Sequence, residues 1–165
     1  MAADVNQAPY STLISRARAN FHDPVASASF ESSKILEFLL DALGDINTEY
    51  TTGHTIEDGA ISPESSFDAY GTLATTMVFG ASVLMARAMA VSANNYNIDI
   101  RKSGTSLSVG NQVRAWIQIA EDMQDKFDHA KQRLIYRSTT GERVTLNALT
   151  EPDMSTTSTV EGTSQ

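Results

Sequence analysis

The segment from Ser62 to Asn95 constrains the fold most, because its sequence predicts one long helix that is apolar on all sides. Ser62 suits the N-cap of this helix and Pro63 its first helical position. A helix without a polar face has to be covered by other elements, so we expect it at the centre of a bundle. The apolar residues form three faces, with Leu73, Met77, Gly80, Leu84 and Val91 on one, Val78, Met85 and Met89 on a second, and Phe79, Val83, Ala86 and Ala90 on a third.

The window from Leu73 to Ala93 is also long enough to cross a membrane. It contains Arg87 among several serines, threonines and alanines, and an arginine near the centre of a span costs roughly 3 kcal/mol on insertion scales. We therefore interpret it as a buried helix of a soluble protein with no membrane contact. Arg87 is expected to reach solvent along its stem or to pair with an acid from another helix, and binding of a ligand or a second subunit is the alternative.

Three further helices are predicted around this central one. The first, Ser11 to Phe21, is short enough to act as a docking arm, and the second, Glu31 to Asn47, is amphipathic. The last begins after an N-cap at Ser108 and continues to Tyr136. Its apolar seam is the most regular in the chain and consists of Val113, Trp116, Ala120, Met123, Phe127, Ala130 and Leu134. We expect Trp116 and Phe127 to be core residues.

Both longer amphipathic helices carry a row of acids on the side away from their apolar stripe. The rows consist of Glu37, Asp41 and Asp45 on the earlier helix and of Glu121, Asp125 and Asp128 on the later one. A carboxylate-bridged metal site would need an apolar shell and a Glu-x-x-His partner, and neither helix supplies them. We interpret both rows as solvated faces.

Two connections between the helices are predicted to be non-helical. Residues Thr48 to Pro63 are rich in threonine, glycine and acids and predict a long loop, in which His54 to Ile61 has some extended character. Residues Tyr96 to Val109 alternate polar and apolar side chains on either side of Ser103-Gly104, which predicts a β-hairpin. Two strands alone are marginal in water, so this hairpin should pack on the helices or be extended by another chain.

The helical pattern ends at Arg137, and threonine, serine, glycine and glutamate dominate as far as Gln165. Such a segment cannot bury enough apolar area to order itself, so it is either disordered or ordered by a partner. The residues expected to contact that partner are Arg143, Val144, Leu146 and Leu149.

The sequence thus predicts a mainly α protein, a small helical bundle with a long central helix, a long C-terminal helix, a short β-hairpin and an extended C-terminal tail. Three parts follow: an N-terminal arm with a short helix (1–30), a helical core (31–136) with the loop 48–63 and the hairpin 96–109, and the tail (137–165).

Composition and missing motifs exclude several functions. The formal net charge of −8 opposes binding of nucleic acid through its phosphates. Without cysteine there are no disulfides, thiolate zinc sites or cysteine nucleophiles. The three histidines lie in separate segments, and HExxH, GxGxxG, Walker and GxSxG motifs are absent. Residues Ile56 to Gly59 lack the spaced ligands of a calcium loop. We expect no enzyme, no metal and no cofactor.

The first residues, Met1 to Asn6, have no basic region and lead into no apolar stretch, so a secretory signal is not expected and the protein is interpreted as intracellular in origin.

Four elements together carry a resemblance to a known family. They are the amphipathic helix Glu31–Asn47, the small-residue helix Phe67–Asn95, the predicted hairpin Asn97–Val109 and the helix Asn111–Glu121. In this order they resemble the head-to-tail connector, or adaptor, proteins of tailed bacteriophages. The resemblance implies a virion structural protein of the neck that is assembled in the host cytoplasm. It forms a ring, typically of twelve copies, beneath the portal and passes DNA to the tail.

The resemblance also implies the partners. These are further copies of the chain, the portal protein, and neck or tail proteins on the tail-proximal side, which the segment 137–165 would reach. The loop 48–63 is longer than the family implies and is a candidate intersubunit contact. A passage in which DNA slides without specific binding should repel phosphates, so we expect one of the two acidic rows to face it. The alternative function is a soluble helical protein-binding module, a bacterial regulator or chaperone-like protein, that grips its partner with the Leu73–Val91 helix.

Overall fold

A computed structural model of the chain describes residues 3–22, 29–102, 109–136 and 145–146. Within these ranges the fold is mainly α-helical, as the sequence predicts. The helices are α1 (Tyr10–Phe21), α2 (Ser32–Glu49), α3 (Thr72–Lys102) and α4 (Val109–Tyr136). The shorter elements are β1 (Tyr50–Thr51), β2 (Thr55–Glu57), β3 (Ala60–Ser62), the 3₁₀ turn η2 (Glu64–Ser66) and β4 (Thr145–Leu146).

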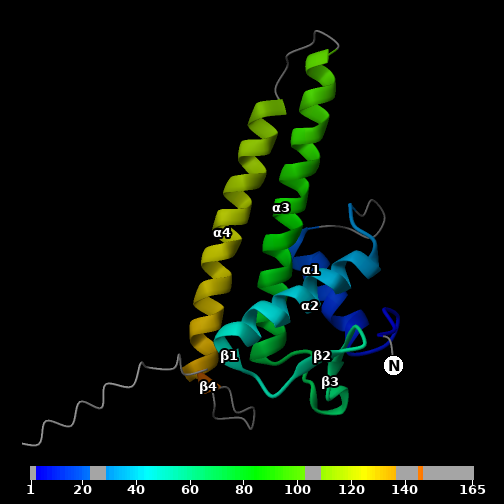
Figure 1. Cartoon of the computed structure of the whole chain (residues 1–165), viewed down its shortest axis with the longest axis vertical. Coiled ribbons are helices and arrows are strands. Elements are labelled where there is room, and N and C mark those ends of the chain that lie inside the picture. The colour runs from blue at the N-terminus through cyan, green and yellow to red at the C-terminus, as the bar shows by residue number, and fades with distance from the viewer. Residues whose placement is uncertain (1–2, 23–28, 103–108, 137–144, 147–165) are drawn as a thin grey trace, which may run out of the picture.

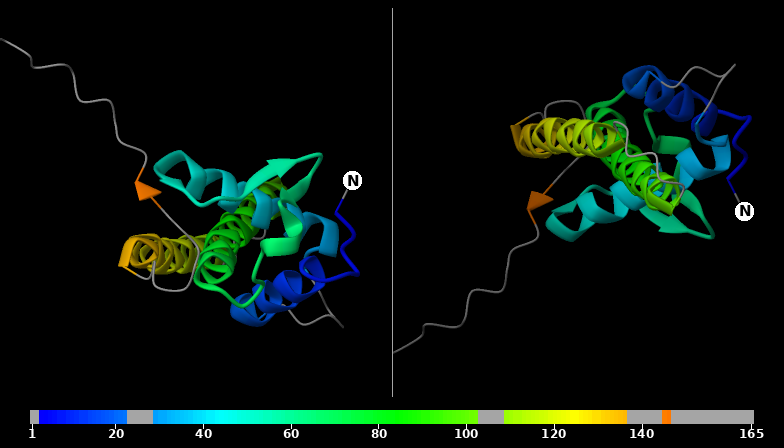
Figure 2. Two further views of the ribbon diagram at one scale, coloured as in Figure 1. Left: turned by 90° about the horizontal axis from the view of Figure 1, so that it is seen from below. Right: turned by 90° about the horizontal axis from the view of Figure 1, so that it is seen from above.

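The long helices α3 and α4 form an antiparallel pair, and α1 and α2 pack against the lower half of α3 (Figure 1). Seen along the long axis, α3 lies between α4 on one side and α1 and α2 on the others (Figure 2). The expectation that the apolar helix is central is therefore confirmed. The upper half of the α3–α4 pair extends beyond α1 and α2.

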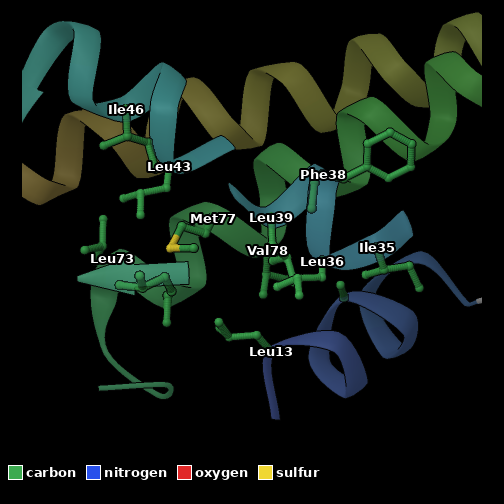
Figure 3. Packing of buried hydrophobic residues seen from close by; sticks show 14 of the residues in the cluster. Leu13, Ile35, Leu36, Phe38, Leu39, Leu43, Ile46, Leu73, Met77 and Val78 are labelled. Atoms are coloured by element: carbon green, nitrogen blue, oxygen red, sulfur yellow. The ribbon is translucent and has the colours of Figure 1, made fainter. Parts of the chain in front are cut away.

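The core lies where α1, α2 and the lower half of α3 meet (Figure 3). Leu13 of α1, Ile35 and Leu39 of α2 and Met77 of α3 are among its fully buried side chains. Burial of each such side chain contributes about 1.5–3 kcal/mol. Met77 belongs to one of the apolar faces predicted for the central helix, and its burial confirms that prediction.

The seam of α4 is buried unevenly. Ala120, Phe127 and Leu134 are buried, whereas Trp116 is only half-buried. The Trp116 ring stacks on Phe21 of α1, with the centroids 5.7 Å apart. Phe127 is a core residue as predicted, but Trp116 joins α4 to the end of α1 at the edge of the bundle, because the upper part of α4 has no third helix to cover it.

The start of α3 differs from the prediction. The helix begins at Thr72 rather than at Ser62, after the 3₁₀ turn Glu64–Ser66 and an extended Phe67. Phe67 is buried and its ring meets His54 edge to face at 5.3 Å. A further turn follows, in which the Gly71 amide donates to the Asp68 carbonyl. The helix-start pattern at Ser62-Pro63 was thus overridden by the burial of Phe67.

The hairpin predicted at 96–109 is wrong in its first strand. The backbone of α3 remains helical as far as Lys102, and Val109 is already the first residue of α4. Residues 103–108, which would form the turn and most of the second strand, lie outside the described residues. A helix that continues keeps its own hydrogen bonds and its contact with α4, while an isolated two-stranded hairpin is marginal. The tertiary contact therefore outweighs the alternating pattern.

A hairpin does occur in the segment predicted to be a loop. Strands β2 and β3 pair antiparallel, with Ile56 opposite Ile61. Asp58 and Gly59 form the turn with φ values of 51° and 73°, the left-handed geometry that an Asp-Gly turn favours. The extended character of His54 to Ile61 was correctly noted, but the Asp-Gly turn signal was assigned to a loop.

The segment from Thr72 to Asn94 has a mean hydropathy of 1.5 and is long enough to span a membrane, the one such helix within the described residues. In this structure 56% of that window is buried inside the protein. This burial is typical of the core helix of a bundle, because the apolar faces are already covered by α1, α2 and α4.

Candidate functional site: an acidic groove along three helices

Two acids of each row line adjoining hollows of the bundle, while Glu37 and Asp128 line neither. Asp41 and Asp45 of α2 line one hollow, and Glu121 and Asp125 of α4 line the next. The hollows have volumes of about 330 Å³ and 340 Å³ and share Arg87 and Gln124. We call them the lower groove and the upper groove. The sequence predicted each row separately and gave no indication that the fold brings them together.

The lower groove lies where α2, α3 and α4 meet. Its apolar wall includes Gly80, Val83 and Phe127, and Asp41, Asp45 and Lys131 stand at its rim. A methyl group added at Gly80 would lie 2.7 Å from the Ala42 Cβ and 2.9 Å from the Phe127 ring. The absence of a side chain at Gly80 therefore lets the three helices approach closely enough to bring the acids of α2 beside α4.

Lys131 supplies a buried positive charge to the lining of the lower groove. Its ammonium lies 2.7 Å from Glu49, 3.4 Å from Asp128 and 3.7 Å from Asp45. The Lys131 side chain is 9% exposed, while the three carboxylates remain about half exposed. Its charge also lies over the Phe127 ring, 4.8 Å from the centroid. One buried cation thus holds acids from two helices in place.

Electrostatics at this cluster favour the charged lysine. Burial alone lowers the pKa of Lys131, but the hydrogen bond to Glu49 and the charges of Asp45, Glu49 and Asp128 outweigh it, so the pKa is raised above 10.5. Burial, followed by the charge of Glu49, raises the pKa of the neighbouring Tyr50 above 10.0. Both groups therefore keep their protons at neutral pH.

Arg87 lies between the two hollows and donates to the Gln124 side-chain oxygen at 3.0 Å. Gln124 in turn donates to Asp128 at 3.0 Å. Arg87 is exposed, so the expected reach to solvent is confirmed. Its pairing with an acid of another helix is indirect, because an amide stands between the guanidinium and the carboxylate. Arg87, Gln124, Asp128 and Lys131 form a polar chain from α3 across α4 to the acids of α2.

The remaining acids are at the surface. Glu37 is exposed and pairs with Lys34 one turn away on α2 at 2.5 Å. Asp41, Glu121 and Asp125 are exposed as well, and within the described part of the chain no ion pair is recorded for them. Asp45 and Asp128 are also at the surface, but they belong to the Lys131 cluster rather than to a purely solvated face.

Of the tail residues predicted to contact a partner, Leu146 falls within the described residues. It pairs with Tyr50 in a two-stranded antiparallel sheet of β1 and β4, in which Thr145 lies opposite Thr51. This extended part of the tail therefore pairs with the chain itself. Arg143, Val144 and Leu149 lie outside the described residues.

Lys131 and Gln124 were not predicted as site residues. The pair Asp128 and Lys131, three residues apart on one helix, was a detectable signal. The contact with Glu49 joins positions 82 residues apart, and no local spacing reveals it.

Among the described residues, no group of three or more histidine and acidic side chains is arranged to hold a metal ion. The fold and the groove define a small helical protein with an acidic surface. Comparison with known protein families, curated proteins and solved structures finds no match for this chain.

Proposed function

We propose that this protein is a structural, non-enzymatic adaptor of the head-to-tail interface of a tailed phage, assembling as a ring beneath the portal protein. Support comes from the order of the amphipathic, small-residue and C-terminal helices that resembles this family. The observation that carries the proposal is that acids of both rows, Asp41 and Asp45 on α2 and Glu121 and Asp125 on α4, line two adjoining hollows of a helical bundle. In a ring of such subunits, a wall of carboxylates repels DNA phosphates and lets DNA slide.

The α2 row, Glu37 and Asp41 with Asp45, is our candidate for the wall of the passage. The α4 row is the less suitable one, because the exposed Ile117 lies beside Glu121. A wall that only has to repel DNA has no use for exposed apolar side chains.

The test is charge reversal of the α2 row in assembled particles. The double variant Glu37→Lys and Asp41→Lys should still assemble, because both side chains are exposed. It should slow the release of DNA from the particle, since lysines in the passage attract phosphates. The matched control, Glu57→Lys with Asp122→Lys, makes the same charge change at exposed positions outside both grooves. Equal release rates for the reversal, the control and the wild type would refute the assignment of this wall.

A soluble protein-binding module is the second candidate function, and the upper groove favours it. Its floor combines small and apolar side chains with an acidic rim, as a docking surface for a helix does. The two candidates differ in assembly. A module of this kind stays monomeric or dimeric with any partner, whereas an adaptor forms a ring with its portal.

A further inference from the structure

The upper groove has an apolar floor and an acidic rim on α4, and Arg87 and Gln124 line the part that it shares with the lower groove. Ala90 of α3 and Ala120 of α4 are buried in its floor, next to Ile117. Glu121 and Asp125 form the rim on α4. Because both floor alanines are small, the backbone of an incoming element can come close to α3 and α4.

Large apolar side chains are exposed on both helices of this region. Val91 of α3 is 61% exposed and Ile117 of α4 is 46% exposed, and they are two of the four large exposed hydrophobic residues in the described part of the chain. Val91 follows Arg87 by one helical turn and so lies on the same side of α3 as the groove. A single exposed valine or isoleucine is ordinary, but a pair beside one hollow indicates a contact surface.

The packing of α2 in the lower half of the bundle indicates that a helix can pack on the upper groove. There α2 crosses α3 at Gly80 and contacts α4 through the Lys131 cluster. Above α2, no described helix covers this side of the α3–α4 pair (Figure 1). A second helix would fit here in the way that α2 fits below, with its apolar side toward the floor.

Charge distinguishes three possible ligands of the upper groove: a second copy of the chain, the chain's own tail and another protein. Contact with the same groove of a second copy would bring two sets of Glu121 and Asp125 together, which is repulsive. The chain's own tail is acidic too, because Glu151, Asp153 and Glu161 are its only charged residues beyond Arg143. The two other exposed large hydrophobic residues of the described chain, Ile56 and Tyr70, lie outside the helices, so a second copy presents no exposed apolar helix of another kind.

We propose that the upper groove binds an amphipathic α-helix of another protein, with an apolar stripe over Val91 and Ile117 and lysines or arginines over Glu121 and Asp125. This is the helix-in-groove mode of recognition, in which apolar anchors give affinity and flanking charges give orientation. The inference goes beyond the adaptor role and does not depend on it.

The test uses two synthetic peptides of the same helical leucine and alanine pattern, one with lysines on the flank of the stripe and one with glutamates. Binding to the full-length protein is measured by fluorescence anisotropy. Methyl NMR then locates the contact. The lysine peptide should bind and shift the Ile117 and Val91 methyl signals, while the buried Ile61 signal stays unchanged. The glutamate peptide should not bind, because the rim repels it.

Variants distinguish binding of the lysine peptide in the upper groove from its non-specific attraction to an acidic protein. The double variant Glu121→Lys and Asp125→Lys should weaken the lysine peptide about tenfold or more and should gain binding of the glutamate peptide. The control Glu31→Lys with Glu57→Lys changes the net charge equally at exposed positions outside the groove and should have a much smaller effect. Ile117→Ser should weaken binding without changing the net charge.

Three results would overturn the proposal. They are failure of the lysine peptide to bind, equal weakening by the groove and control variants, and methyl shifts confined to sites away from Ile117 and Val91. Circular dichroism confirms that each variant remains folded. None of these results bears on ring formation, so the inference and the adaptor role fail independently.

Discussion

At the scale of residues, Lys131 determines how the acidic side of the molecule is held. Its ammonium contacts carboxylates of both α2 and α4 while its own side chain is 9% exposed. Within the sequence, Asp128 and Lys131 stand out as a helical pair, but Glu49 and Asp45 join them only because α2 crosses α3 at Gly80. Spacing alone reveals Asp45, Asp128 and the Asp128–Lys131 pair, whereas the contact of Lys131 with Glu49 arises only in the folded chain.

Replacement of Lys131 by methionine should lower the free energy of unfolding by about 1–3 kcal/mol, because three carboxylates then repel one another without a cation. The loss stays below that of a fully buried pair, since all three acids are about half exposed. Urea unfolding measures the change. Lys34→Met is the control: its pair with Glu37 is exposed, so it should cost no more than about 1 kcal/mol. Equal losses for both variants would contradict the account.

Stability should also fall in alkaline solution. The pKa values of Lys131 and Tyr50 are raised in the folded protein, so their contribution is present below their ordinary values of 10.5 and 10.0 and is lost as pH rises through the raised values. The free energy of unfolding should therefore decrease above about pH 10. Tyr50→Phe should reduce that decrease when unfolding curves at pH 8 and pH 11 are compared. A steeper decrease of the free energy of unfolding in the Tyr50→Phe variant would show that the pKa of Tyr50 is not raised by folding.

At the scale of elements, local patterns located the helices and missed where tertiary contacts move their ends. The periodicities of α1, α2 and α4 predicted their positions to within two residues at each end. The start of α3 at Thr72 depends on the buried Phe67, and its continuation to Lys102 accompanies its packing on α4. Both ends depend on contacts made in the folded chain, which the local hydrophobic pattern does not contain.

A substitution at Gly80 tests whether α2, α3 and α4 approach one another closely. Alanine normally stabilises a helix interior by up to about 1 kcal/mol relative to glycine. At Gly80 the new methyl group meets Ala42 and Phe127 at less than 3 Å, so Gly80→Ala should instead destabilise by about 1–2 kcal/mol. Gly44→Ala on α2 is the matched control, because its nearest neighbour, Ile56, is 3.8 Å away. This variant should be neutral or stabilising in thermal unfolding. A stabilising Gly80→Ala would refute the tight crossing.

At the scale of the whole molecule, the bundle leaves three surfaces for contacts: the acidic rows, the upper groove and the C-terminal segment that begins beside β1. The mainly α class and the central position of α3 were correctly predicted, because an all-round apolar helix requires cover on every side. The two grooves were not predicted from the sequence, because they depend on where α2 ends relative to the α3–α4 pair.

Deletion of Asp153 to Gln165 should leave the melting temperature unchanged, because this stretch of mainly threonine, serine and acidic residues has little apolar surface to bury. It should weaken attachment to a neighbouring ring, which co-sedimentation with purified necks measures. A longer truncation after Tyr136 also removes β4 and should cost no more than about 1 kcal/mol, since the described part of this segment is the two-residue strand β4. Loss of folding after the shorter deletion would place the tail in the core.

The central claim, that this chain is a ring-forming adaptor, is tested most directly by native mass spectrometry of the protein co-expressed with the portal protein of its genome. We expect a complex of one portal ring with many copies of this chain, twelve if the family resemblance extends to stoichiometry. Failure to associate with the portal, or a complex that holds only one or two copies, would contradict it.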